Sequence, residues 1–391
     1  MIFVFDTYER GGIYLPNLIT DTSIKPQSPE WWDLCIKPPY SYEFRFLRYL
    51  WFDKVKFRIE NIRDVDEPCV YPINLNFFDP GIDQFEYMSD LAKQKARDRM
   101  LTIWFYYCEG DDVKWDIDRR LHQLAEQHQI PTKQIKFTMG NRSVTENELY
   151  SYFPDHEFLY RYLNTGSNYI KQVNFKPRSK KFTCLNRMDK PFRRIFAATL
   201  VSKGFDVDAY FSYTDQKYAV EKTVSESDVS QWDSWDHAVL DRFDPPYRCD
   251  ELQDHEHNLH KLIDERFFQD AYWNVVVETD IATLFLTEKT FKPILNLQPF
   301  VIVGAPGSIQ LLHELGYKTF SKWIDESYDS IEDSEQRLKK CLELVKQISS
   351  MTHAEHVKMQ QDMAEILLYN QRHFLSDKSA KLLNLLDKIS Q

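Results

Sequence analysis

The chain has 391 residues, too many for one compact core; at about 150 residues per domain this length predicts two or three lobes. Hydrophobic residues make up 43%, charged residues 28% and aromatic residues 15%, which excludes a disordered or fibrous chain. A formal charge of -11 argues against a protein that clamps nucleic acid over its whole surface, and neither a G-x-G-x-x-G nor a Walker A loop is present.

The six cysteines are scattered without a C-x-x-C pair, which predicts free thiols in a reducing compartment. No stretch approaches the ~18 apolar residues of a membrane span, and the apolar start lacks the basic flank of a secretory leader. These features lead us to expect a cytoplasmic protein with no membrane span.

Strand and helix patterns alternate through the first half of the chain, after about sixty aromatic-rich residues without a clear pattern. The expected elements are a strand at 70–75, a helix at 84–100, a strand at 101–107, a helix at 116–129 and a strand at 134–139. This alternation predicts βαβ units and a parallel sheet.

The alternation resumes after a tyrosine-rich stretch. The expected elements are strands at 181–185, 207–213, 273–277 and 300–303, with helices at 191–203, after 287–289 and at 308–315. A polar, acidic insertion covers about 214–270, and three amphipathic helices follow residue 331. We therefore expect an α/β protein with lobes at 1–170 and 171–330 and a helical segment at 331–391 that packs across them.

A basic stretch at 176–194 carries eight cations and one acid. Asn186, Arg187 and the helix that starts at Pro191 would lie at the carboxyl end of a parallel strand, where such sheets bind ligands. Helix N–H groups and an arginine suit a phosphate. On charge alone a solvated basic surface is an equal alternative, and a non-catalytic nucleotide or nucleic-acid binding module would use the same stretch.

A second polar cluster follows the strand at 273–277, which ends at Glu278. The next helix opens with Thr287-Glu288-Lys289: Thr287 is the expected N-cap, Glu288 could accept hydrogen bonds from ribose hydroxyls, and Lys289 could neutralise a phosphate. Taken alone, this tripeptide is more often ordinary helix capping. Pro293 predicts a kink or a short first turn in this helix.

Both clusters carry a family resemblance. The run from Glu278 to Gly304, followed by Ala-Pro-Gly307, resembles the donor-binding motif of the α-1,3-fucosyltransferases, in which T-E-K precedes a helix and a strand that ends in glycine. Pro191-Phe-Arg193 is similar to the start of that family's P-x-R-x-x-F-x-x-x-L helix, whose arginine contacts the donor diphosphate. The same blocks resemble, more closely, uncharacterised phage and marine-virus glycosyltransferases.

This resemblance implies a GT-B fold, with two Rossmann-like lobes facing a cleft, and a GDP- or UDP-linked nucleotide sugar held by the second lobe. It implies an inverting, metal-independent transfer with no cofactor besides the donor, and a place in the host cytoplasm if the protein is viral. The acceptor, a glycan, a protein or modified DNA, is not implied. The implied donor-binding residues are Arg193, Glu288 and Lys289, followed by Asn186, Arg187, Glu278 and Thr287.

An inverting transfer also needs a carboxylate on the other lobe to take the proton of the acceptor hydroxyl. In the fucosyltransferases a glutamate at a comparable strand end is the base, so the resemblance favours Glu109 and then Asp112, which follow the strand at 101–107. Asp79 and Asp83 are further candidates.

A metal-dependent hydrolase is the second alternative. His255, His257 and His260 form the one histidine-dense patch, but neither an H-E-x-x-H pattern nor a cysteine accompanies them, which favours a polar insertion helix. Trp232 and Trp235, in the acidic insertion, are candidates to stack on a sugar or a base.

Overall fold

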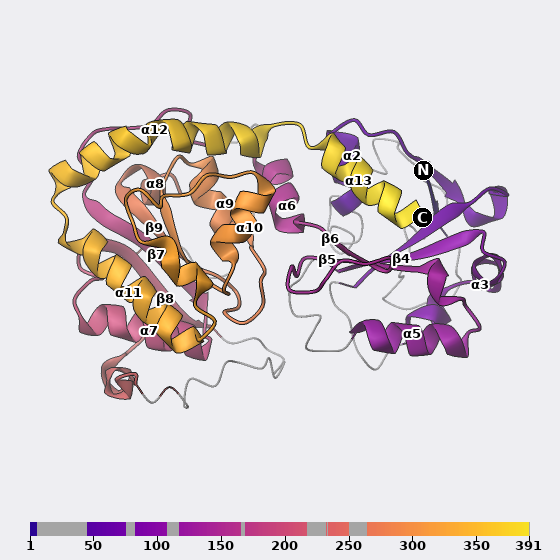
Figure 1. Cartoon of the computed structure of the whole chain (residues 1–391), viewed down its shortest axis with the longest axis horizontal. Helices are drawn as coiled ribbons and strands as arrows, with labels where there is room; N and C mark the ends of the chain where they lie inside the picture. Colours follow the sequence, from indigo (N-terminus) through magenta and orange to yellow (C-terminus); the bar gives the residue numbers. More distant parts are fainter. Residues whose placement is uncertain are drawn as a thin grey trace. The chain divides into compact units, whose positions relative to one another are not determined.

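A computed structural model describes residues 1–5, 45–75, 83–107, 117–165, 169–216, 232, 234–249 and 264–390. The chain divides into two compact units, Met1–Leu159 with Asp377–Gln391 and Tyr160–Ser376. Each unit is built on a parallel β-sheet with helices packed against it (Figure 1). The predicted α/β class is therefore confirmed. Among the described residues, no helix combines the length and the apolar character that a membrane span requires.

The first unit contains a sheet in the order β2-β1-β3-β4-β5-β6, with every pairing parallel. Its strands are β1 (Ile2–Phe5), β2 (Arg58–Asn61), β3 (Cys69–Asn74), β4 (Leu101–Tyr107), β5 (Ile135–Met139) and β6 (Tyr150–Tyr152). The central strand β4 is buried over nearly its whole length, as expected for a strand covered on both faces.

Helices cover both faces of this sheet. They are α2 (Arg45–Phe52), α3 (Asp90–Arg97), α5 (Ile117–Gln127) and α13 (Ser379–Ser390), while α6 (Asp155–Asn164) spans the division between the units. Figure 1 shows α2 and α13 on one side of the sheet and α3 and α5 on the other. A buried ion pair between Lys378 and Glu157, 2.7 Å apart, fixes the residues that lead into α13.

The second unit contains a sheet in the order β10-β9-β7-β8, again with every pairing parallel. Its strands are β7 (Lys180–Met188), β8 (Ala209–Gln216), β9 (Ala271–Val277) and β10 (Phe300–Val303). Its helices are α7 (Pro191–Ser202), α8 (Arg266–Gln269), α9 (Glu288–Leu295), α10 (Ser308–Leu315), α11 (Ser334–Ser350) and α12 (His353–Leu375). Helix α11 packs against α7 and β7, and α12 packs against α9. Figure 1 shows α7 and α12 on opposite sides of the sheet.

The first four strands of each sheet share one order when they are counted from the sheet's own first strand: second, first, third, fourth. In doubly wound sheets of this kind the connections reverse direction between the first and the third strand, and ligands bind outside the carboxyl ends of those two strands. In the second unit these strands are β7 and β9, and the start of α7 follows directly on β7.

Several elements differ from the sequence expectations. The helix expected at 84–100 is divided into a 3₁₀ helix, η3 (Gln84–Tyr87), and α3, because the side chain of Ser89 caps a new helix by accepting from the N–H of Ala92. The tyrosine-rich stretch contains β6 and α6, which no pattern predicted. The helices after residue 331 do not differ in this way: as expected, they form no separate unit, and α11 and α12 belong to the second unit and α13 to the first. Pro293 lies inside α9, a helix of only eight residues.

Candidate functional site

Three segments of the second unit meet at the carboxyl ends of β7 and β9. They are residues 186–193, which run from the end of β7 into the start of α7, residues 278–279, which follow β9, and residues 287–292, which start α9. We call these segments together the carboxyl-edge site. All seven residues expected to bind the donor lie within them.

The connection from β7 to α7 is held on one side by β8. The register of β7 shifts between Asn186 and Met188, a bulge of the kind found next to binding sites. The hydroxyl of Thr214 donates to the Arg187 carbonyl, and the hydroxyl of Tyr213 donates to Asp189 Oδ1 over 2.5 Å. Burial raises the pKa of Tyr213, and the hydrogen bond to Asp189 raises it further. The connection is therefore fixed before any ligand arrives.

Arg193 and Lys190 fix the other side of the connection to the end of β9. The Arg193 guanidinium, 3% exposed, donates to the Glu278 carbonyl from Nε over 3.1 Å and from Nη2 over 2.6 Å. The Lys190 ammonium donates to the Thr279 carbonyl over 2.7 Å. Carbonyl acceptors satisfy these N–H groups but do not neutralise the positive charges, so both bonds place cations at the end of β9.

Glu278 anchors the start of α9. Its side chain is buried, and Oε1 accepts from the N–H of Thr287 over 3.1 Å and from the Thr290 hydroxyl over 2.7 Å, while Oε2 accepts from the Thr287 hydroxyl over 2.6 Å. Thr287 is the N-cap of α9, as predicted, because its Oγ1 also accepts from the N–H of Lys289. Both carboxylate oxygens of Glu278 are thus engaged within the chain, which suits positioning more than ligand contact.

Lys289 reaches back over the same segment. Its Nζ lies 3.2 Å from Thr279 Oγ1, 3.1 Å from Thr287 Oγ1 and 3.3 Å from Glu288 Oε1, and its side chain is 27% exposed. Arg193 and Lys289 come from separate sequence blocks, yet both contact residues 278–279. The structure therefore brings the two predicted cations to one place.

The helices that start at this edge differ in how their N-termini are occupied. Helix α9 has Thr287 and Glu278, and α10 has the Asp329 carboxylate, which accepts from the N–H groups of Ile309 over 2.8 Å and Gln310 over 3.0 Å. The N-cap of α7 is Lys190, whose side chain makes no capping hydrogen bond. Of these three helices, α7 is the one for which the described residues show no carboxylate accepting from the N–H groups of the first turn, where the positive end of the helix dipole lies.

Asn186, at the carboxyl end of β7, adds a polar group to this edge. It is 2% exposed, its Nδ2 lies 3.4 Å from the Cys184 sulfur, and its Oδ1 has no hydrogen-bond partner in the described part of the chain. A buried acceptor without a partner costs about 1–3 kcal/mol unless a ligand or water satisfies it.

Two further residues of this region were missed by the sequence analysis. Lys292 lies one turn after Lys289 on α9; burial lowers its pKa to about 8, and the negative charge of Glu288 partly opposes that effect. The spacing of three residues from Lys289 was an available signal. Tyr160 on α6 is fully buried; burial raises its pKa, as does the charge of Glu288. Its place in the aromatic run Tyr160-Arg-Tyr162 was an available signal.

The remaining candidates lie elsewhere or cannot be placed. Glu109, Asp112 and Asp79 fall outside the described residues, and the description stops at Tyr107, the carboxyl end of β4. Asp83 pairs with His128, with 2.7 Å between Oδ2 and Nε2. His128 follows the end of α5, and a helix that connects parallel strands ends at their amino edge, so Asp83 lies on the wrong edge for a catalytic base.

The metal and aromatic hypotheses fare differently. His255, His257 and His260 lie outside the described residues, and within those that are described no group of three His, Cys, Asp or Glu side chains is arranged to hold a metal. Trp232 and Trp235 are described and buried, with ring centroids 5.5 Å apart. Because Trp235 Nε1 donates to the Thr199 hydroxyl on α7 over 3.0 Å, this pair packs against α7 instead of forming an exposed stacking platform.

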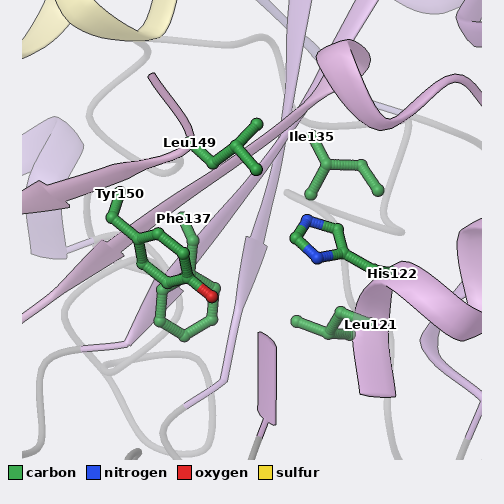
Figure 2. A pocket seen from close by; sticks show the side chains of 6 residues that line it. All are labelled: Leu121, His122, Ile135, Phe137, Leu149 and Tyr150. Atoms are coloured by element: carbon green, nitrogen blue, oxygen red, sulfur yellow. The ribbon is translucent and has the colours of Figure 1, made fainter. Parts of the chain in front are cut away.

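A separate shallow hollow lies in the first unit (Figure 2). Its lining residues come from α5, β5 and the start of β6: Leu121, His122, Ile135, Phe137, Leu149 and Tyr150. No lysine or arginine lines it. It therefore does not compete with the carboxyl-edge site as a place for an anionic ligand.

Comparisons with known proteins give a distant structural likeness. No family model and no curated protein sequence matches the chain. A solved structure of an α1,3-fucosyltransferase is similar with a TM-score of 0.39 and 11% sequence identity, over 87% of this chain and 84% of that one. A likeness of this size is too distant to assign a function.

Proposed function

We propose that the protein is a glycosyltransferase that binds the diphosphate of a nucleotide sugar at the carboxyl-edge site and transfers the sugar to an acceptor hydroxyl. One observation carries the proposal: Lys190, Arg193 and Lys289 gather around residues 278–279, beside the start of α7 and between the two strands where sheets of this order bind ligands. The resemblance of these same segments to fucosyltransferase donor motifs supports the reaction type.

The chemistry of such a transfer needs positive charge where the diphosphate leaves. As the bond between the anomeric carbon and the phosphate oxygen breaks, that oxygen gains negative charge, which fixed cations and helix N–H groups stabilise without moving. Lys289, whose side chain is 27% exposed, is assigned the direct contact. Arg193 is buried, and its positive charge would stabilise the diphosphate without direct contact. Fixed cations of this kind would do the work of a metal ion.

The other site residues take supporting roles in this proposal. Glu288 would accept hydrogen bonds from the ribose hydroxyls. Glu278 and Thr287 hold the start of α9 in place, and the unpartnered Oδ1 of Asn186 would accept a hydrogen bond from the donor. Arg187, on the bulge, would flank the phosphates.

Transfer with inversion completes the proposal. The acceptor oxygen forms a bond to the anomeric carbon as the bond to the diphosphate breaks, and a carboxylate takes the hydroxyl proton. Glu109, with Asp112 as second choice, remains the proposed base. The donor nucleobase, GDP- or UDP-linked, and the acceptor, a glycan, a protein or modified DNA, are left to experiment.

The distribution of the basic stretch favours a donor site over a nucleic-acid surface. Its cations lie at both ends of β7, and several are already committed: Arg178 and Arg193 are buried, Arg194 pairs with Asp189, and Lys180 donates to the Val207 carbonyl. A surface that tracks a nucleic-acid backbone needs a continuous row of exposed cations.

Thermal unfolding with a panel of nucleoside diphosphates and their sugar conjugates tests the function. Ligand at one hundred times its Kd should stabilise the protein by about 2.7 kcal/mol, and the matching sugar conjugate should then be turned over with the acceptor panel. Failure of every diphosphate to raise the melting temperature would contradict the proposal. Salt-sensitive binding of nucleic acid without turnover would favour the binding-module alternative.

A further inference from the structure

Arg337, near the start of α11, is a buried guanidinium that holds loops instead of pairing with an acid. It is 1% exposed, and its described hydrogen bonds all go to uncharged oxygens. Nε donates to the carbonyl of Gly304 over 2.9 Å and Nη2 to that of Ile281 over 2.6 Å; the other acceptors are the carbonyls of Ile331 and Glu332 and the hydroxyl of Ser334. One side chain therefore ties three segments together.

Two of these segments adjoin the carboxyl-edge site. Ile281 lies three residues after Glu278, and Gly304 directly follows β10. Gly304 also lies against Glu278: a Cβ added at Gly304 would be 3.5 Å from the Glu278 Cβ, and the N–H of Glu278 donates to the Val303 carbonyl over 2.9 Å. Arg337 thus fixes the far end of the 278–281 loop and the strand end against which Glu278 packs.

We propose that Arg337 is a positioning residue for the carboxyl-edge site. By holding Ile281 and Gly304, it sets the place of residues 278–279, whose carbonyls and hydroxyl receive Arg193, Lys190 and Lys289. The inference rests on the proposed function in that this site binds a diphosphate. It assigns to the C-terminal helices, outside both motif blocks, a part in donor binding.

The same unit offers a matched control in Arg178. This guanidinium is 5% exposed and donates to the carbonyls of Phe268 and Ala271 over 2.8 Å and 2.5 Å. Ala271 is the first residue of β9, so Arg178 holds the amino edge of the same sheet. Loss of either arginine removes hydrogen bonds from buried carbonyls, but of the two only Arg337 adjoins the site.

The experiment compares Arg337→Lys and Arg337→Met with Arg178→Lys and Arg178→Met, each checked for a folded state by circular dichroism. Calorimetric titration with GDP and UDP should give a Kd raised about tenfold in Arg337→Met, raised less in Arg337→Lys, and unchanged in the Arg178 pair. In turnover, the KM for the donor should rise more than kcat falls. Folded Arg337 variants that bind and turn over as the wild type would overturn the inference, as would equal losses in the Arg178 pair.

Two further measurements keep the outcome decisive. If Arg337→Met does not fold, Gly304→Ala replaces it, because the added Cβ would lie 3.2 Å from Ile302 Cγ2 and from Ser308 Oγ and should displace the same loop. If the wild type binds no diphosphate, the proposed function fails, and hydrogen exchange then tests positioning alone. Faster exchange across 278–290 in the Arg337 variants than in the Arg178 variants supports it, and equal exchange overturns it.

Discussion

Charged side chains have different roles at the amino edge and at the carboxyl edge of the second sheet. At the amino edge, Asp270 accepts from the N–H and hydroxyl of Ser179 and from Tyr210, and Arg178 donates to the Phe268 and Ala271 carbonyls, so these charged groups bind other parts of the same unit. At the carboxyl edge, Lys190, Arg193 and Lys289 converge where α7 begins. Because the helix that follows a parallel strand begins at the carboxyl edge, positive dipole ends collect there. The comparison teaches that an anion-binding site is indicated more by cations at the carboxyl edge of a parallel sheet than by the number of charged residues.

The largest expected effect is on catalysis at the carboxyl edge. Lys289→Met should lower kcat/KM by about 10²–10³, because one fixed donor of positive charge at the leaving group is worth ~2.7–4 kcal/mol. Lys339→Met is the control, since Lys339 on α11 is similarly exposed and pairs with Glu335 over 3.1 Å. Steady-state rates with the donor found by thermal shift measure both. Equal rates for the two variants would end the assignment of Lys289.

Acid should weaken the amino edge first. His356 is fully buried and stacks on Tyr272 of β9; its Nε2 lies 3.0 Å from the Ile348 carbonyl, and its Nδ1 has no partner among the described residues. Burial lowers the pKa of His356 from 6.5 to about 4. Between pH 6.5 and 4, this imidazole is therefore protonated in the unfolded chain but neutral in the native state. The free energy of unfolding should fall by about 3 kcal/mol as pH drops across this range.

Urea unfolding across this pH range measures the slope. His356→Gln should remove most of that slope, and His353→Gln, at the exposed neighbour, should keep it. A slope unchanged in His356→Gln would show that other groups cause the acid sensitivity.

Replacing a carboxylate should lower the free energy of unfolding more at the carboxyl edge than at the amino edge. Glu278→Gln places an amide NH₂ against groups that donate hydrogen bonds and should lower the free energy of unfolding by about 2 kcal/mol. Asp270→Asn changes a carboxylate that also accepts three hydrogen bonds, but one that is less buried, and should cost about 1 kcal/mol or less. Chemical denaturation ranks the pair, and the reverse order would contradict this account of Glu278.

The smallest effect compares two lysines that each donate to a loop carbonyl. Lys190 donates to Thr279 beyond the carboxyl end of β7, and Lys180 donates to Val207 at the amino end. Lys190→Met should weaken diphosphate binding about fivefold, an effect of about 1 kcal/mol, while Lys180→Met should leave it unchanged. Titration calorimetry at fixed salt detects the difference. If Lys180→Met weakened binding as much, the diphosphate would sit elsewhere.

Much of the second unit was predictable because its hydrophobic periodicity agrees with the residues that begin and end its helices. Pro191 begins α7, Gly204 follows its end with a φ of 69°, and Thr287 caps α9, so local chemistry fixed each boundary. The convergence of Arg193 and Lys289 followed from the rule for carboxyl ends, once both blocks had been placed after strands.

Other features depend on contacts that no pattern in one sequence reports. Glu278 looked like a ligand contact, but its partners Thr287 and Thr290 engage both carboxylate oxygens. Arg337 lies in an ordinary amphipathic helix, and only the fold brings it to Gly304 and Ile281. Strand β6, three residues long, is too short to show a period.

The return of residues 377–391 to the first unit has a consequence for synthesis. Residues 160–376, the whole second unit, leave the ribosome before the first unit has its last helix. Until Lys378 arrives, the buried carboxylate of Glu157 lacks this ammonium partner, and α2 and β4 lack α13. The part of the chain made first is therefore completed last, and a truncation after Ser376 would damage the opposite unit from the one it shortens.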